Sequence, residues 1–196
     1  MKIKILQINN GCSANCLHCP YSSRKADNFR IESLLKKIGN SDYLLITGGE
    51  PMEHKEIEKI TYILNQKNKY FRIATGGHIA LKEYMYSIKK FDFFCGFSIG
   101  TDIVIPERNP AKNLEIIWLE NIKQLINEKV NYSITITFDS DFNLSKLVLF
   151  LQNNTKPDFV TLSEIHGKSI PSEKIAGATK LISNSLGVKV LYGYRN

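Results

Sequence analysis

The chain has 196 residues, of which 43% are hydrophobic and 23% are charged, a composition typical of one globular domain. No apolar run approaches the roughly 20 residues needed to span a bilayer, and the first residues lack a signal-peptide pattern, so we expect a cytoplasmic protein with no membrane partner. The net charge of +7 comes mostly from scattered lysines, without a run of five basic residues, which makes nucleic acid a possible but disfavoured partner.

Strand-like and helix-like segments alternate along the sequence. Short apolar or alternating runs predict strands over residues 2–9, 43–47, 70–75, 93–99, 130–138, 159–165 and 188–192. Amphipathic stretches predict helices over residues 29–38, 55–65, 81–88, 114–128, 144–152 and 172–186. Strand and helix therefore alternate six times before a trailing strand, and this order predicts parallel strands joined by right-handed crossovers.

Six strand–helix units are too few for the closed eight-stranded barrel. We therefore expect an α/β fold, an open partial (βα)6 barrel with its helices outside, formed by residues 1–196 as a single domain. The strand predicted over residues 130–138 supports this curvature, because Ser133, Thr135 and Thr137 share one face and apolar residues share the other. A flat sheet covered on both faces would be apolar on both, so the polar face indicates a lumen.

Three of the four cysteines, Cys12, Cys16 and Cys19, follow the first predicted strand with the spacing C-x3-C-x2-C. Thiolates this close in sequence can bind one soft metal centre, and three of them leave a position open where a closed site takes four. The clustering favours metal-binding thiols in a reducing compartment over disulfides. The fourth cysteine, Cys95, alternates with phenylalanines and is expected to face the helices as a small buried hydrophobe.

A second motif, Gly48-Gly49-Glu50-Pro51, closes the next predicted strand. With the cysteine spacing and the six-unit order, it makes the chain resemble the radical S-adenosylmethionine (SAM) superfamily over essentially its whole length. The resemblance implies that the three clustered cysteines bind three irons of a [4Fe–4S] cluster. SAM would chelate the fourth iron through its amino and carboxylate groups.

The resemblance also implies which residues contact SAM and the substrate. His18 stands where the family often has an aromatic residue near the adenine, and Glu50 with its glycines would receive the methionine amino group. As a plainer alternative, Glu50 is a helix-start carboxylate before a proline. The implied cofactor-binding set is His18, Gly48, Gly49, Glu50, Pro51, Ser98, Asp102, Thr135 and Thr137. Candidate substrate contacts at the carboxyl ends of strands are Thr75, Glu164 and His166.

By this resemblance, an external donor such as flavodoxin or ferredoxin reduces the cluster, and SAM is cleaved reductively to a 5′-deoxyadenosyl radical. The radical would abstract hydrogen from a small-molecule or peptide substrate that the sequence does not identify. A second hypothesis is an activating enzyme that installs a glycyl radical on a partner enzyme. A third, of another class, is a non-enzymatic zinc or redox-sensing module in which His18 joins the cysteines as a zinc ligand.

Overall fold

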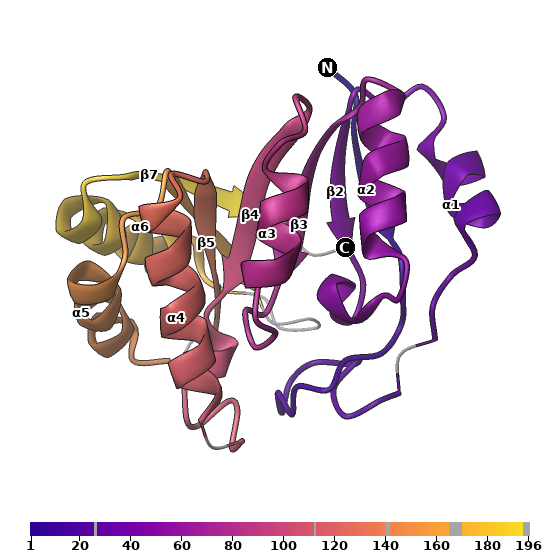
Figure 1. The fold of residues 1–196 in the computed structure, drawn as a ribbon. Helices are drawn as coiled ribbons and strands as arrows, with labels where there is room; N and C mark the ends of the chain where they lie inside the picture. The colour runs from indigo at the N-terminus through magenta and orange to yellow at the C-terminus, as the bar shows by residue number, and fades with distance from the viewer. Residues whose placement is uncertain (26, 112, 140–141, 165–169, 194–196) are drawn as a thin grey trace.

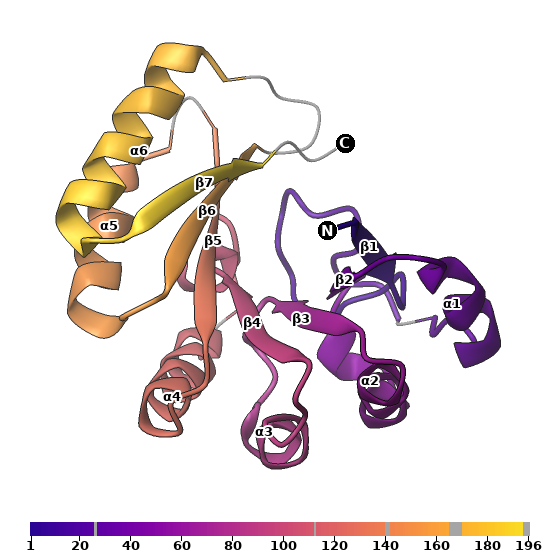
Figure 2. The same ribbon diagram turned by 90° about the horizontal axis from the view of Figure 1, so that it is seen from above.

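The computed structural model describes residues 1–25, 27–111, 113–139, 142–164 and 170–193. Seven parallel strands form one sheet whose spatial order follows the chain order from β1 to β7. Figure 2 shows that the sheet curls into a half-barrel with the helices on its outer side, open between β1 and β7. The predicted partial barrel is therefore confirmed.

The strands and α-helices alternate as the sequence predicts, with small differences at their ends (Figure 1). The strands are β1 (Ile3–Gln7), β2 (Tyr43–Thr47), β3 (Tyr70–Thr75), β4 (Phe94–Gly100), β5 (Tyr132–Phe138), β6 (Phe159–Glu164) and β7 (Lys189–Gly193). The α-helices are α1 (Ile31–Ile38), α2 (Ile57–Gln66), α3 (Lys82–Ile88), α4 (Leu114–Asn127), α5 (Leu144–Asn154) and α6 (Ser172–Leu186). Two 3-10 helices, η1 (Pro51–Glu53) and η2 (Asp102–Val104), follow β2 and β4 and were not predicted.

The two faces of the sheet differ in chemistry. The outer face is covered by the helices, and its side chains, such as Ile73, Ile99 and Ile134, have no exposed surface. The concave face is polar, because the register places Ser98 beside Ser133 and continues with serines and threonines on β5 and β6. Burial of the outer face stabilises the sheet, while the concave face remains suited to a polar ligand.

The expected position of Cys95 is wrong. A register shift between β3 and β4 falls at Gly96, whose φ is 102° and whose missing Cβ would lie 2.0 Å from the carbonyl oxygen of Asn131. The shift interrupts the alternation, so Phe94 packs on Phe97 with ring centroids 5.2 Å apart. Cys95 is half-buried and outside the core cluster, because a bulge reverses the faces of the residues before it.

Within the described ranges, none of the helices combines the length and the apolar character needed to cross a membrane.

Candidate metal centre and cofactor site

The three clustered cysteines lie on an irregular loop between β1 and α1, at the carboxyl end of the first strand. Main-chain hydrogen bonds fold this loop on itself: Cys12 N–H donates to Arg24 O at 3.0 Å, and Cys19 N–H donates to Cys16 O at 3.2 Å. It is also tied to the loop after η2, because Leu17 N–H donates to Arg108 O at 2.8 Å. The cysteine loop is thus held by its own main-chain hydrogen bonds and by the segment that follows β4 and η2.

The thiols are free and partly shielded from water. Cys12 is buried, whereas Cys16 and Cys19 are half-buried. Burial raises the pKa of the Cys12 thiol strongly, and burial with the nearby charge of Asp102 raises the pKa of Cys16 to about 12. One buried group favours the thiolate, since Asn109 Nδ2–H donates to Cys16 Sγ at 3.3 Å. A metal centre would replace the thiol protons and remove this cost, so the donor set fits a thiolate-ligated cluster.

The Gly48-Gly49-Glu50-Pro51 segment packs directly against the start of the cysteine loop. Gly49 N–H donates to Asn9 Oδ1 at 2.9 Å, and Asn9 Nδ2–H donates to Glu50 O at 2.7 Å. A Cβ on Gly49 would lie 1.9 Å from the carbonyl oxygen of Gly11. The glycines are therefore required where the two loops touch, a reason that the sequence alone did not reveal.

Glu50 is completely buried and its carboxylate is held by the protein. Oε1 accepts from Met52 N–H at 3.0 Å, while Oε2 accepts from the Thr75 hydroxyl and from Gly76 N–H, both at 2.9 Å. Burial raises the pKa of Glu50, and these hydrogen bonds and His78 oppose that rise. Glu50 caps η1, as the helix-start alternative expects, and contact with a methionine amino group stays a prediction. The Thr75 hydroxyl points to Glu50, and its contact with substrate likewise stays a prediction.

The ends of β4 and β5 bring together other predicted residues. His18 Nε2 lies 3.4 Å from Asp102 Oδ2, and Arg108 Nη1 lies 3.1 Å from Asp102 Oδ1. Burial would raise the pKa of Asp102, but the hydrogen bond from His18 and the charge of Arg108 outweigh it and hold that pKa below its usual value. On the concave face, the hydroxyls of Ser98 and Thr135 lie 2.8 Å apart.

Three buried polar atoms of the cysteine loop and the carboxyl-end region of the strands have no hydrogen-bond partner among the described residues: His18 Nδ1, Ser163 Oγ and Arg108 Nη2, the last lying 4.0 Å from Asp139 Oδ1. Arg108 Nη1–H also donates to the main-chain oxygen of Thr137, a buried residue on the concave face. Buried polar groups are nearly always satisfied in the functional state. These atoms therefore indicate a polar ligand near the cysteine loop and the strand ends, a role that the polar groups of SAM could fill.

Glu164, another substrate candidate, ends β6, which pairs with the last strand, β7. Glu164 Oε1 accepts from the Tyr192 hydroxyl at 2.5 Å and from Ile170 N–H at 3.1 Å, which ties the ends of β6 and β7 together. His166 lies outside the described residues.

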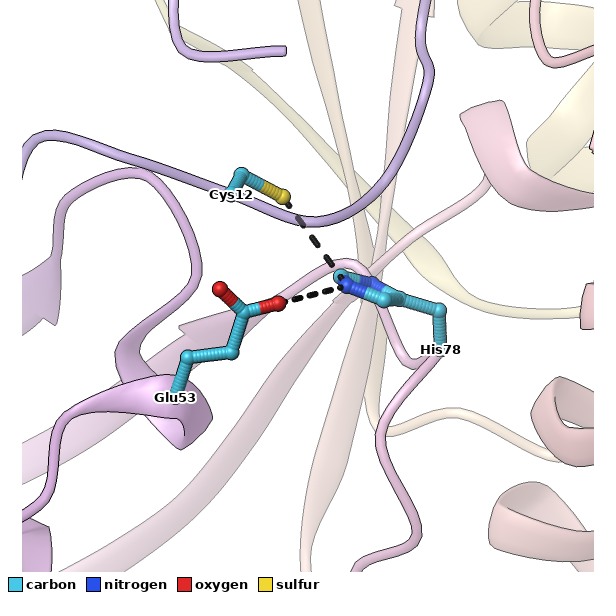
Figure 3. Close-up of side chains that lie close together, drawn as sticks. All are labelled: Cys12, Glu53 and His78. Atoms are coloured by element: carbon cyan, nitrogen blue, oxygen red, sulfur yellow. Dashed lines mark hydrogen bonds and ion pairs between the residues drawn. The ribbon is translucent and has the colours of Figure 1, made fainter. Parts of the chain in front are cut away.

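Sequence reasoning missed four residues of this region, Glu53, His78, Arg108 and Asn109. Figure 3 shows the side chains of Glu53 and His78 pointing toward Cys12. His78 follows the two glycines after β3, so its position at a strand's carboxyl end was a usable signal. The other three sit on 3-10 or loop segments whose approach to the cysteines depends on the tertiary fold.

A family model described as the radical SAM superfamily matches residues 6–150. The chain belongs to the radical SAM superfamily. Among known proteins it is similar to one from Methanocaldococcus jannaschii, provisionally assigned as a glycyl-radical enzyme activating enzyme, with 27% identity over 81 residues. That match covers 38% of this chain and 32% of the relative.

Solved radical SAM structures share this fold at low sequence identity. Streptococcus suis SuiB bound to SAM superposes with a TM-score of 0.76 and 13% identity, covering 100% of this chain and 50% of SuiB. TYW1 with a lysine–pyruvate adduct gives a TM-score of 0.65 at 15% identity, covering 93% and 70%. TsrM from Kitasatospora setae gives 0.60 at 10% identity, covering 83% and 36%. The chain thus spans half the length of SuiB and about a third of the relative from M. jannaschii.

Proposed function

We propose that this protein is a radical SAM enzyme that binds a [4Fe–4S] cluster through Cys12, Cys16 and Cys19 and abstracts hydrogen from a substrate held in the half-barrel. One observation carries the proposal: a three-thiol loop stands at the carboxyl end of β1, beside the polar edge of a partial barrel. When bound, the cluster and SAM supply a 5′-deoxyadenosyl radical. The single described sheet supports one domain over residues 1–196.

The chain's own residues bind and orient the reactants. Asn109 holds the Cys16 sulfur by its amide N–H, and its own Oδ1 is fixed by accepting from Ala111 N–H at 2.9 Å. His18, Asp102 and Arg108 form a connected polar group beside the cysteine loop. We propose that this group and the Ser98–Thr135 pair contact SAM. The segment of residues 48–51 packs against the start of the cysteine loop and supports it.

The substrate is proposed to enter through the open side of the half-barrel. The sheet is not closed between β1 and β7, which supports this side as the entry (Figure 2). SuiB has been solved bound to its precursor peptide SuiA, which supports a peptide as one substrate class. The serines and threonines of the concave face support a small polar molecule as a second substrate class. An electron donor such as flavodoxin or ferredoxin would act from outside, in a reducing compartment that suits four free cysteines.

Anaerobic reconstitution with iron and sulfide tests this proposal. The wild-type protein is expected to absorb broadly in the visible range, and after reduction to convert SAM into 5′-deoxyadenosine. Cys16→Ser should lose both properties. Cys95→Ser is the matched control, because Cys95 lies on β4 away from the cluster loop, and it should keep both. A colourless wild-type protein that leaves SAM intact would refute the proposal.

A second candidate, a glycyl-radical activating enzyme, is favoured by the relative from M. jannaschii. In this case 5′-deoxyadenosine formation would require a partner protein, and a carbon-centred radical signal would appear on that partner. The test mixes the reduced, SAM-loaded protein with glycyl-radical enzymes from the same genome and records electron paramagnetic resonance spectra. Turnover that depends only on a peptide or metabolite would rule this candidate out.

A further inference from the structure

Cys12, Glu53 and His78 bring three different ligand types to one point. Cys12 Sγ lies 3.9 Å from His78 Nε2, and Glu53 Oε1 lies 3.3 Å from the same nitrogen (Figure 3). All three ligand atoms lie within 4.8 Å of one another. They come from three separate segments: the cysteine loop, η1, and the turn after β3.

Two of the three separations between these atoms are close to those around a tetrahedral metal ion, and the third, between sulfur and oxygen, is within 4.8 Å. Zinc bonds of about 2.3 Å to sulfur and about 2.0–2.1 Å to nitrogen and oxygen place sulfur and nitrogen about 3.6 Å apart and nitrogen and oxygen about 3.4 Å apart. The nitrogen–oxygen separation of 3.3 Å already agrees. The sulfur–nitrogen separation of 3.9 Å needs to close by only a few tenths of an ångström.

The histidine ring is oriented as metal-bound histidines are. Its side chain is 3% exposed, and Nε2 faces Cys12 and Glu53. The opposite nitrogen, Nδ1, lies 3.5 Å from Glu50 Oε2 and is buried without a hydrogen bond. A metal bound to Nε2 leaves the ring proton on Nδ1, and the Glu50 carboxylate can then accept a hydrogen bond from Nδ1–H. This is the carboxylate–histidine–metal arrangement that orients zinc ligands in other proteins.

Glu53 is also held in place. Its carboxylate accepts from Ser13 N–H at 3.0 Å and from the Ser13 hydroxyl, so the acid is anchored to the cysteine loop one residue from Cys12. Ser13 Oγ lies 3.2 Å from His78 Nε2. Three protein ligands with a fourth position left for water are a common zinc coordination set.

We propose that Cys12, Glu53 and His78 form a mononuclear site for a divalent ion of the zinc type in the cluster-free protein. Binding replaces the Cys12 thiol proton, which is released to solvent, and no electron is transferred. Because Cys12 also belongs to the cluster motif, the ion and the cluster compete for one thiolate. Zinc occupancy therefore blocks cluster assembly. The site does not depend on the proposed enzymatic function, since it is measured on protein without cluster or SAM.

Cobalt(II) provides the first test, because it reports tetrahedral geometry and thiolate ligation by its visible and near-ultraviolet absorption. Metal-free protein kept anaerobic should bind one Co²⁺ with tetrahedral bands and the sulfur charge-transfer intensity of a single thiolate. A variant lacking both Cys16 and Cys19, each changed to Ser, should keep this spectrum. Glu53→Gln and His78→Gln should each weaken binding by more than the about 10–100-fold that loss of an outer-shell partner costs.

Glu58→Gln is the matched control for Glu53→Gln, because Glu58 is an exposed acid on the neighbouring helix α2. It should leave Co²⁺ binding unchanged. Circular dichroism checks that each variant is folded, and Glu53→Gln, which keeps the side chain's shape, covers the case in which His78→Gln unfolds the protein. Three-thiolate intensity that disappears in the Cys16/Cys19 variant would overturn the proposal, as would the absence of tight Co²⁺ binding.

Competition is tested by loading the protein with one equivalent of Zn²⁺ before iron and sulfide are added. Wild-type protein should assemble much less cluster after zinc loading, measured by visible absorption and by iron content. Glu53→Gln should assemble equal amounts with and without zinc, because it binds the ion weakly. Full cluster assembly in wild-type protein that still retains its zinc would show that the two centres do not share Cys12.

Discussion

Arg72 is predicted to hold the curl of the half-barrel, and its replacement by methionine should destabilise the protein by about 3 kcal/mol. The guanidinium lies on the concave side with only 9% of the residue exposed. Nη2–H donates to Cys95 O at 2.7 Å, and Nη1–H donates to Phe97 O at 3.1 Å and to Ser133 Oγ at 3.0 Å. It also packs on the Phe159 ring at 5.0 Å, so one side chain from β3 contacts β4, β5 and β6.

The magnitude follows from what Arg72→Met leaves behind. The two carbonyl oxygens flanking Gly96 lose their side-chain donor inside the protein, at about 1–3 kcal/mol each. Removal of a buried charge offsets part of this loss, because no ion pair to Arg72 exists within the described ranges and its desolvation is not repaid by a carboxylate. Ser133→Ala removes one acceptor only and should cost about 1 kcal/mol.

Urea unfolding of the metal-free, reduced protein, followed by circular dichroism, measures these changes. The double variant should lose less than the sum of the two single losses by about 1 kcal/mol, because the residues share one hydrogen bond. Arg72→Lys should recover only part of the stability, since an ammonium group cannot reach three separated acceptors as a planar guanidinium does. A loss for Arg72→Met within about 0.5 kcal/mol, the usual range for surface substitutions, would refute the reasoning.

Three further predictions concern other parts of the molecule. Gly49→Ala should lower the unfolding free energy by about 1–3 kcal/mol and reduce iron incorporation, because the alanine Cβ would lie 1.9 Å from the carbonyl oxygen of Gly11 in the cysteine loop. An unchanged urea midpoint and an unchanged iron content would contradict this. Burial raises the pKa of Tyr132 in the folded protein. The contribution of its neutral hydroxyl to protein stability is therefore complete below about pH 10, the pKa of an unfolded tyrosine, and is lost as pH rises through the folded pKa. Tyr132→Phe should therefore be less stable than wild type at pH 8 by about 1 kcal/mol, from loss of the hydroxyl that accepts a main-chain N–H at 2.6 Å, and this difference should shrink above pH 10 in urea unfolding. Asn109→Leu removes the N–H donor to Cys16, and this donor favours the reduced form of the proposed cluster. The variant should therefore have a midpoint potential lower by about 40–60 mV in a redox titration followed by electron paramagnetic resonance. An unchanged potential would show that the donor has no effect on the cluster.

The features of the fold that sequence reasoning predicted are those that local patterns encode. Period-two alternation in β5 placed Ser133 and Thr135 on one face, and the structure puts that face on the concave side. The helix predicted over residues 172–186 has these bounds in the structure, where Gly187 caps α6 with φ of 67°. These features depend on residues within one or two turns of each other, so a single sequence is enough to predict them.

The errors and omissions arise where distant segments decide the geometry. The faces of β4 reverse at Gly96 because two strands slip in register and Asn131 closes on the glycine, and no spacing within β4 shows this. The hydrogen bonds that hold the Glu50 carboxylate were not predicted, because Thr75 ends β3 and Gly76 follows it, far from Glu50 in the sequence. The motif identified the loops that form the site, whereas the contacts that occupy each side chain follow from tertiary packing.

The cysteine loop contains no helix or strand within its described residues, so the side chains that contact it determine which metal its thiols can bind. On one side, Arg108 O accepts from Leu17 N–H and Asn109 Nδ2–H donates to Cys16 Sγ, which ties this part of the loop to the segment after η2. On the other side, His78 faces Cys12 from beyond β3. In our proposal Cys12 binds either the cluster, together with Cys16 and Cys19, or a single ion, together with Glu53 and His78. The metal that binds Cys12 therefore decides whether the loop forms a three-thiolate cluster site or a single-thiolate ion site. On this proposal, zinc bound at Cys12 has to leave before the cluster can be assembled on the three cysteines.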